Sequence, residues 1–399
     1  MQYISKNIQF IRQRLLHDFK DLLFIRLFYS AALSSYWAFN MLILKQIGVN
    51  SKLVYIRFIL TFAFILFYSH LFLNKKVLFY RKSIKVGLFF RLMTIFTMII
   101  YPSIVVWLCN SFLVAISMLL FWMPFNSLYF SLAKILRSKG LFSGLYSFLP
   151  SAVGIIMPLL SGYLANIYGL KISFAMAAFI MVLAIILANK IKENFEYFDL
   201  EREAKIHRKI RKYWIMEGIY YTSNVILTYI TVNDFVNKPL DLGIYLSLIT
   251  TAAAFTALFL SYLSDKIKGI NLLLYVFLFL LSISYIPAIF IKDIESWYFS
   301  NVIIKILRTL VHPFIIKLTV DLAFDVKDAY LAREYYLALG RVLGFGIGAL
   351  FIIFNIPRYI LLIYPPIYFI WLYSLRKEKI KEIGDPILAL QKKLKKLEF

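Results

Sequence analysis

Residues 103–131 read SIVVWLCNSFLVAISMLLFWMPFNSLYFS and contain no charged side chain. An α-helix rises about 1.5 Å per residue, so about 20 apolar residues cross the roughly 30 Å hydrocarbon core of a bilayer. An uncharged run of this length predicts a membrane-spanning helix. The fold must therefore be sought among integral membrane proteins.

The rest of the chain has the same character. Hydrophobic residues make up 61% of the 399 residues, charged residues only 17%, and the mean hydropathy is +0.76. Soluble domains carry about 25% charged residues. The alternating ten-residue pattern of membrane β-strands is absent, so we expect an all-α membrane protein. A single cysteine, Cys109, and four scattered histidines predict no disulfide framework, metal site or cofactor.

Twelve apolar runs lie between charged or turn-forming breaks. They predict spans at 21–44, 52–74, 84–101, 103–131, 142–166, 170–190, 212–232, 241–263, 269–291, 296–322, 329–355 and 358–375.

The distribution of Lys and Arg tests the orientation of these spans, because cytoplasmic loops of membrane proteins are enriched in both. With both termini cytoplasmic, the inner segments hold 32 Lys and Arg, the outer loops hold six and the spans hold seven. This bias predicts a multi-pass protein of the cell membrane with its N- and C-termini in the cytoplasm. The net charge of +24 then needs no nucleic-acid partner.

The longest polar stretch falls in the middle of the chain and divides the spans into six and six. We expect two six-helix pseudo-repeats joined by a charged, helical linker. Residues 1–20 read either as a basic amphipathic helix on the inner membrane surface or as a solvated tail. The expected divisions are 1–20, the N-terminal half 21–190, the linker 191–211, the C-terminal half 212–376 and a basic cytoplasmic tail 377–399.

Small residues recur every four positions in one span of each half. The fifth span has Gly154, Pro158 and Gly162 in GIIMPLLSGYLANIYG. The eleventh has Gly340, Gly344 and Gly348 in GRVLGFGIGALF. Small residues at this spacing let membrane helices approach closely, and a stripe in equivalent spans indicates a duplicated unit.

At these residues the chain resembles a major facilitator superfamily transporter. SYLSDKIKG, from Ser261 to Gly269, is similar to the loop signature of that family, and GIIMPLLSG is similar to its span-five signature. The resemblance implies two halves that tilt about a central site, lined by spans one, four, seven and ten. It also implies that Asp265 meets the N-terminal end of span five in the closed inner gate. A monomer that exports or exchanges its solute is expected.

Charge is distributed unevenly between the halves. The 171 residues between Asp21 and Glu193 contain no Asp or Glu but 16 Lys and Arg. Arg26, Arg57 and Arg91 fall within spans, about 8–11 Å from a boundary, where they could either reach lipid phosphates or face a cavity.

The tenth span carries basic residues at greater depth. In NVIIKILRTLVHPF, residues 301–314, a single helical face presents Asn301, Lys305, Arg308 and His312. Lys305 and Arg308 lie about 14–18 Å deep, so this face should meet water. Two interpretations stay open: the cations attract an anionic substrate, or they pair with acids of the same half. Arg341 lies comparably deep in the eleventh span and is expected to pair with an acid.

The polar and charged residues within the predicted spans and their loops supply the candidates for substrate binding and for coupling. The predicted substrate contacts are Lys305, Arg308, His312, Asn301, Asn224, Tyr221 and Asn110. The predicted coupling and gating residues are Glu217, Asp265, Asp321, Glu334 and Arg341.

The sequence thus predicts a secondary transporter of a small amphipathic or anionic organic solute, with proton coupling as an open question. The lipid bilayer, the solute and H⁺ are its expected partners. The alternatives are a multidrug exporter and a membrane sensor or scaffold without transport. A polytopic enzyme acting on lipids is disfavoured, because no clustered catalytic or metal site is visible.

Overall fold

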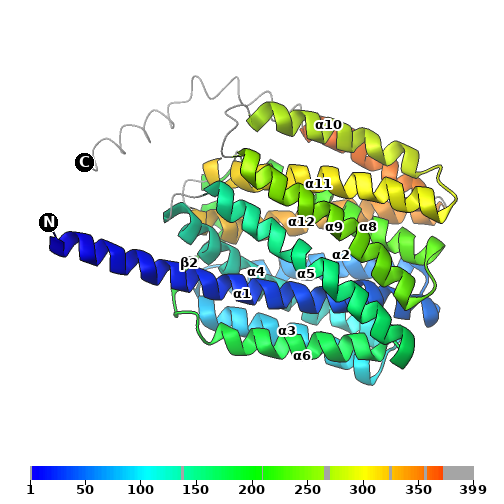
Figure 1. Ribbon diagram of the computed structural model, residues 1–399, viewed down its shortest axis with the longest axis horizontal. Coiled ribbons are helices and arrows are strands. Elements are labelled where there is room, and N and C mark those ends of the chain that lie inside the picture. The colour runs from blue at the N-terminus through cyan, green and yellow to red at the C-terminus, as the bar shows by residue number, and fades with distance from the viewer. Residues whose placement is uncertain are drawn as a thin grey trace.

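The structure is a computed structural model that describes residues 2–135, 139–208, 210–264, 270–322, 326–354 and 357–371. Long helices dominate it and run side by side along the longest axis (Figure 1). They are α1 (Gln2–Gln46), α2 (Ser51–Tyr68), α3 (Tyr80–Ile100), α4 (Ile104–Ile135), α5 (Lys139–Tyr168), α6 (Lys171–Ala188), α8 (Arg211–Ile230), α9 (Pro239–Ser264), α10 (Ile270–Ala288), α11 (Ile294–Leu322) and α12 (Val326–Ile353).

Shorter elements complete the chain. They are the π-helical turns η1 (Ser69–Leu73) and η2 (Thr231–Phe235), the strands β1 (Lys76–Phe79) and β2 (Phe195–Phe198), α7 (Leu200–Ile206), the 3₁₀ segment η3 (Pro357–Ile363) and a helix over 364–371.

Eight helices are long and apolar enough to cross a membrane within the described residues: α1 to α6, α9 and α12. This supports the predicted all-α membrane protein. The helices α8, α10 and α11 lie where spans seven, nine and ten were predicted, but their described parts are not both long enough and apolar enough to count among the eight. Charged residues such as Glu217 in α8 and Arg308 in α11 lower their hydropathy, and the described apolar part of α10 is short.

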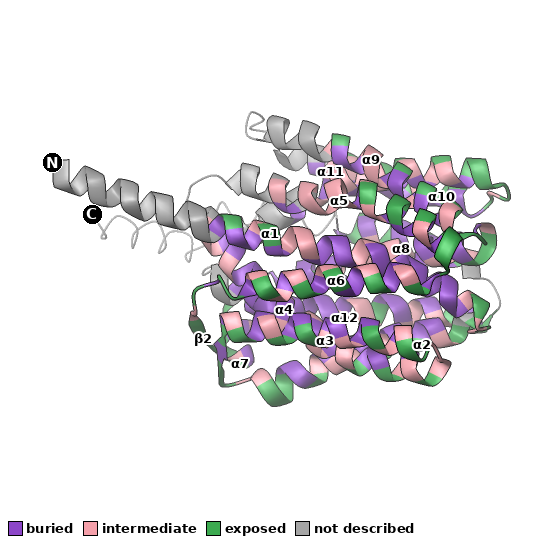
Figure 2. Ribbon diagram, turned by 60° about the horizontal axis from the view of Figure 1, so that its bottom comes forward, coloured by how far each residue is buried: buried purple, intermediate pink, exposed green. Residues whose placement is uncertain are grey.

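Contacts between helices fall into two sets with a seam between them. Among the first six helices, α1 packs on α5 and α6, and α3 packs on α4 and α6. Later in the chain, α8 packs on α12 and α11 packs on α9 and α10. The seam is formed by α5 against α9 and by α12 against α2 and α4. In Figure 2 the buried residues of α4 and α12 face the interior of the bundle.

Pairs of glycines bring two of these helix pairs close together. Gly162 of α5 faces Gly243 of α9, and a Cβ added to Gly162 would lie 3.0 Å from the Cα of Gly243. Gly218 of α8 faces Gly340 of α12, and a Cβ on Gly340 would lie 2.9 Å from the Cα of Gly218. Any larger side chain would force these backbones apart.

The other small residues of the two stripes also meet neighbouring helices. A Cβ at Gly154 would lie 2.7 Å from Cγ2 of Thr250, and one at Gly344 would lie 2.7 Å from the hydroxyl of Thr222. At Gly348 it would lie 2.6 Å from the ring of Tyr55. Thus α5 uses its stripe against α9, whereas α12 uses its stripe against both α8 and α2.

The central linker is not the continuous helix that its charge pattern predicted. Residues Phe195–Phe198 form β2, which pairs antiparallel with β1 so that Lys76 faces Phe198 and Phe79 faces Phe195. The helix α7 follows, and its N-cap Asp199 accepts a hydrogen bond from the amide of Arg202 at 3.0 Å. The alternating aromatic sequence FEYF suits a strand, and β1 supplies a partner that the sequence alone does not reveal.

The first helix continues through the predicted boundary at residue 20, because α1 runs unbroken from Gln2 to Gln46. Just beyond its end, Gly48 has a φ of 75°, the left-handed conformation that favours glycine. Near this end, the Lys45 ammonium lies 2.8–3.1 Å from the carbonyl oxygens of Val232, Asn233 and Val236 and from the side-chain oxygen of Asn237. This contact ties α1 to the end of η2.

The glycine contact between α8 and α12 yields a test. Gly340→Ala should lower the melting temperature of the purified protein, because the added methyl group meets the carbonyl oxygen of Ile215; overpacking of this kind costs about 1–3 kcal/mol. Gly346→Ala on the same helix is the matched control, since nothing lies within 4 Å of its Cβ position. It should melt at the same temperature as the wild type or higher. Equal melting of the two variants would contradict the close approach.

Candidate functional site

A cavity of about 560 Å³ lies between the helices. Side chains from α1, α2, α3, α4, α5, α8, α9, α11 and α12 line it. Both sets of helices therefore contribute, as expected for a central site. The four spans that the resemblance named, now α1, α4, α8 and α11, are among them, and the others enlarge the wall.

The lining is strongly basic. Six cationic side chains take part: Arg26, Arg57, Arg91, Lys305, Arg308 and Arg341. No Asp or Glu lines the cavity among the described residues, and none of the six forms a salt bridge within that part of the chain. The lining itself therefore provides no described carboxylate to balance its positive charge.

Arg308 is held by neutral groups. Its guanidinium donates to the backbone carbonyl of Tyr220 at 2.9 Å, to the hydroxyl of Ser223, and to the hydroxyl of Tyr285 at 3.4 Å. The same guanidinium lies 4.1 Å from the centre of the Tyr220 ring. These contacts orient the cation and leave its charge uncompensated.

Aromatic rings support three further cations. The guanidinium of Arg26 lies 4.5 Å from the ring of Trp122, and that of Arg57 lies 4.9 Å from the ring of Trp107. Arg341 lies 5.1 Å from the ring of Phe62. Cation–π contacts of this kind are worth about 0.5–2 kcal/mol, more where water is excluded.

Arg26, Arg57 and Arg91 were expected either to reach lipid phosphates or to face a cavity, and the structure places all three in the cavity wall. The side chains of Arg57 and Arg91 are only 5% and 6% exposed. The acid-free stretch around them was the sequence signal for this site.

Most of the predicted substrate contacts meet in this cavity. Lys305, Arg308 and His312 of α11 line it together with Tyr221 and Asn224 of α8. His312 Nε2 lies 2.6 Å from the hydroxyl of Tyr221, so the two side chains share a hydrogen bond. The basic face of α11 therefore points into the cavity.

Two predicted contacts lie elsewhere, and Arg341 differs from expectation. Asn110 is buried between α3 and α4, where its side-chain oxygen accepts from the hydroxyl of Thr97 at 3.1 Å. Asn301 donates to the carbonyl of Trp297 within its own helix at 2.8 Å. Both side chains are buried, and neither is among the residues that line the cavity. Arg341 was expected to pair with an acid but rests on aromatic rings.

The buried acids Glu217 and Glu334 both bind Arg333. Arg333 donates through Nε to Glu217 at 3.1 Å and through a second nitrogen to its other oxygen, and it lies 3.4 Å from Glu334. Glu334 also accepts from the Asn126 amide at 3.1 Å, which links α12 to α4. This contact joins the two sets of helices. Asp265 and the side chain of Asp321 lie outside the described residues.

The network reaches the cavity through Tyr146. Its hydroxyl donates to the Asn126 side chain at 2.8 Å, and its ring lies 4.6 Å from the guanidinium of Arg26. A continuous series of contacts therefore runs from Arg26 in the cavity to Glu334 on α12.

Several buried polar atoms in the cavity wall have no hydrogen-bond partner among the described residues. They are the hydroxyls of Tyr29 and Tyr36, the side-chain oxygen of Asn40 and the Nε atoms of Arg26 and Arg91. Buried polar groups are otherwise almost always paired. These five atoms offer hydrogen-bonding positions to the polar groups of a ligand.

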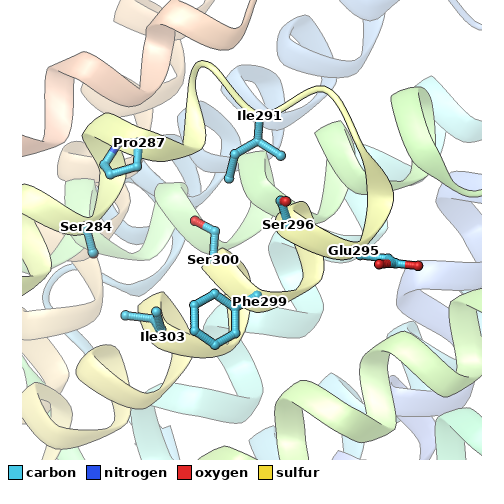
Figure 3. A pocket seen from close by; sticks show the side chains of 8 residues that line it. All are labelled: Ser284, Pro287, Ile291, Glu295, Ser296, Phe299, Ser300 and Ile303. Carbon is cyan, nitrogen blue, oxygen red and sulfur yellow. The ribbon is translucent and has the colours of Figure 1, made fainter.

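A second pocket of about 560 Å³ lies at one end of the bundle, at the turn between α10 and α11 (Figure 3). It is lined by apolar side chains, three serines and Glu295, and by only these two helices. It has no contact with the first set of helices, so it does not suit a central site. No group of three or more metal-ligating side chains occurs in the described part of the chain.

Solved membrane transporters share this arrangement of helices. The human organic anion transporter MFSD10 (TETRAN) matches with a TM-score of 0.66 and 11% identity, over 91% of this chain and 99% of that one. FucP, a major facilitator superfamily transporter in the outward conformation, matches with a TM-score of 0.65 and 14% identity, over 90% of this chain and 98% of that one. Another structure, of the E. coli fucose:proton symporter FucP, matches with a TM-score of 0.64 and 11% identity, over 91% of this chain and 98% of that one.

No protein-family model and no curated protein matches the sequence. At these identities the similarity establishes the fold alone. The predicted resemblance is confirmed at that level, since the chain has the fold of major facilitator superfamily transporters.

The buried ion pair can be tested by a double-mutant cycle. Glu217→Ala and Arg333→Ala should each lower the free energy of unfolding by about 3–5 kcal/mol, because each leaves an uncompensated buried charge. The double variant should lose less than the sum of the two. The exposed pair Lys75–Glu201, at 3.7 Å, is the control and should show a coupling of about 0–1 kcal/mol. Additive losses at Glu217 and Arg333, read from melting temperatures, would contradict the pairing.

Proposed function

We propose that the protein is a secondary transporter that moves a small organic anion across the cell membrane through the central cavity. The observation that carries this proposal is the lining, which combines six cations with aromatic rings and has no described carboxylate. A cavity at the bilayer centre with unpaired cations favours anions strongly, because an anion supplies the missing charge in a medium of low dielectric constant.

Lys305 and Arg308 are the proposed primary contacts of the anion, with Arg341, Tyr221 and Asn224 beside them in the wall. One fold neighbour is described as an organic anion transporter, in agreement with this charge. Another is described as a fucose:proton symporter, so the fold alone does not select an anion. The substrate class therefore rests on the residues of this cavity.

Transport is proposed to proceed by alternating access of two six-helix halves, 21–190 and 212–376, within twelve spans and with both termini cytoplasmic. Contacts across the seam would open and close in turn. At the proposed cytoplasmic end, the Asn126–Glu334 hydrogen bond joins α4 to α12. At the proposed outer end, Lys45 joins α1 to η2, and Gly162 packs on Gly243.

His312 is the residue we propose for proton coupling. Its imidazole lies in the cavity wall and shares a hydrogen bond with Tyr221, so a proton gained or lost there would change the charge felt by the substrate. Glu217, one of the five predicted coupling and gating residues, is held by Arg333 outside the cavity lining.

A multidrug exporter of organic cations fits this lining poorly, because six cations repel a positively charged substrate. A sensor or scaffold without transport would bind anions but move none of them. An enzyme finds no support in its fold neighbours, which are transporters.

Anion flux provides the direct test. Proteoliposomes should take up labelled naphthalene-2-sulfonate in a saturable manner, and Arg308→Gln should reduce the uptake about tenfold or more, since loss of a charged partner costs about 2 kcal/mol or more. Arg202→Gln on α7 is the control, because the Arg202 side chain is 64% exposed and outside the cavity; its flux should stay near the wild-type value. Saturable flux of tetraphenylphosphonium without anion flux would favour a cation exporter. Anion binding without flux would indicate a sensor.

The assignment of His312 can be tested separately. A pH gradient across the proteoliposome membrane should change the wild-type flux of naphthalene-2-sulfonate, a probe that stays fully ionised. His312→Gln should transport at the same rate with and without the gradient, because the amide cannot exchange a proton near neutral pH. A dependence on the gradient that survives in this variant would exclude His312 as the coupling residue.

A further inference from the structure

We infer that the substrate carries at least two negative charges, which bind two separate cation pairs, one from each set of helices. The first pair is Arg57 on α2 with Arg91 on α3, and the second pair is Lys305 with Arg308 on α11. This inference rests on the proposed transport of organic anions and specifies the charge and shape of the anion.

The positive charge of the cavity wall favours a substrate with more than one anionic group. With six cations and no described acid in the lining, a substrate with one negative charge would leave five cations unbalanced in a region of low dielectric constant. A second anionic group on the same molecule would balance further charge. It would do so without a second binding event and its separate entropic cost.

The first pair is anchored by the protein but not neutralised. The Nε of Arg57 donates to the carbonyl of Trp107 at 3.4 Å, and its guanidinium lies over the Trp107 ring. Both arginines act electrostatically on Tyr36, whose hydroxyl has no partner among the described residues. The Nε of Arg91 is also unpaired. An anionic group here would meet two guanidinium groups and a phenol donor.

The second pair lies on a single helical face. Lys305 and Arg308 are three residues apart in α11, so their side chains project to the same side of that helix. Arg308 is oriented by Tyr220, Ser223 and Tyr285, all of them neutral. A carboxylate, sulfonate or phosphate group has the oxygen atoms to accept from both cations.

The wall between the cations favours a flat, unsaturated scaffold. Aromatic residues of α1, α4 and α8 line the cavity alongside both pairs. Rings stack on aromatic side chains at little entropic cost, and a volume of about 560 Å³ suits a molecule of drug-like size. The structure therefore points to an aromatic polyanion. The lining aromatic residues of α1, α4 and α8 are Tyr29, Tyr36, Trp37, Trp122, Tyr220 and Tyr221.

A charge series on one scaffold tests the inference. Binding of naphthalene-2-sulfonate, naphthalene-2,6-disulfonate and naphthalene-1,3,6-trisulfonate is measured by thermal shift of the full-length protein in detergent. Ionic strength is held constant, so that screening does not differ between probes. Sulfonates stay ionised at all working pH values, so protonation cannot alter their charge. The wild type should bind at least one of the polysulfonates about tenfold or more tightly than the monosulfonate.

Variants then test which cation pair binds each anionic group of the substrate. Arg91→Gln and Lys305→Gln should each bring the ratio of polysulfonate to monosulfonate affinity close to one, since either change removes a member of one pair. A ligand-free melting temperature and a circular dichroism spectrum that match those of the wild type show that each variant is folded. Lys171→Gln, an exposed lysine at the start of α6, is the matched control and should keep the wild-type ratio.

The outcomes separate the inference from the proposed function. Equal affinity for all three probes in the wild type would overturn the polyanion inference and leave anion transport standing. A wild-type preference that persists in both cavity variants would overturn the assignment of the two pairs. If none of the three sulfonates binds, the result would count against both the polyanion inference and the proposed anion transport.

Discussion

Six cationic side chains inside an apolar helix bundle, without a described carboxylate beside them, are the constraint around which the rest of this structure is arranged. A charge near the centre of a bilayer is costly, and it persists only with a partner or a polar cavity. Here the partners are ring faces, hydroxyls and backbone carbonyls. Arg26 rests on Trp122, Arg57 on Trp107 and Arg308 on Tyr220. The abundance of aromatic residues thus has a physical role beyond packing.

Close helix approach is what brings these cations to one place. The glycine contact of α5 with α9 draws the two sets of helices together, and that of α8 with α12 packs two helices of the second set closely. Phe345 on α12 stacks against Phe58 and Phe62 of α2, which extends the seam. Cations from helices far apart in the sequence then border a single cavity, where their fields add.

Two arginines of α12 show how the surroundings decide the role of a charge. Arg333 and Arg341 are about two turns apart on the same helix. Arg333 meets Glu217 and Glu334 and is neutralised, so it joins helices. Arg341 lies against aromatic rings, forms no salt bridge among the described residues and stays a cavity cation. The contacts through Asn126 and Tyr146 connect the neutralised cluster with Arg26, so the seam between the helix sets and the cavity share one network.

The sequence by itself determined the membrane setting, nearly every long helix and the basic face of α11, because hydropathy and helical spacing are local properties. It also contained the charge imbalance that makes the cavity basic. Tertiary structure alone decided which cations meet: Arg57 and Arg91 turned to the cavity, whereas Asn110 and Asn301 are buried outside its lining. It also paired Glu217 with Arg333, 116 residues away, and β1 with β2. Such choices depend on which helix faces come together, and no local pattern specifies that.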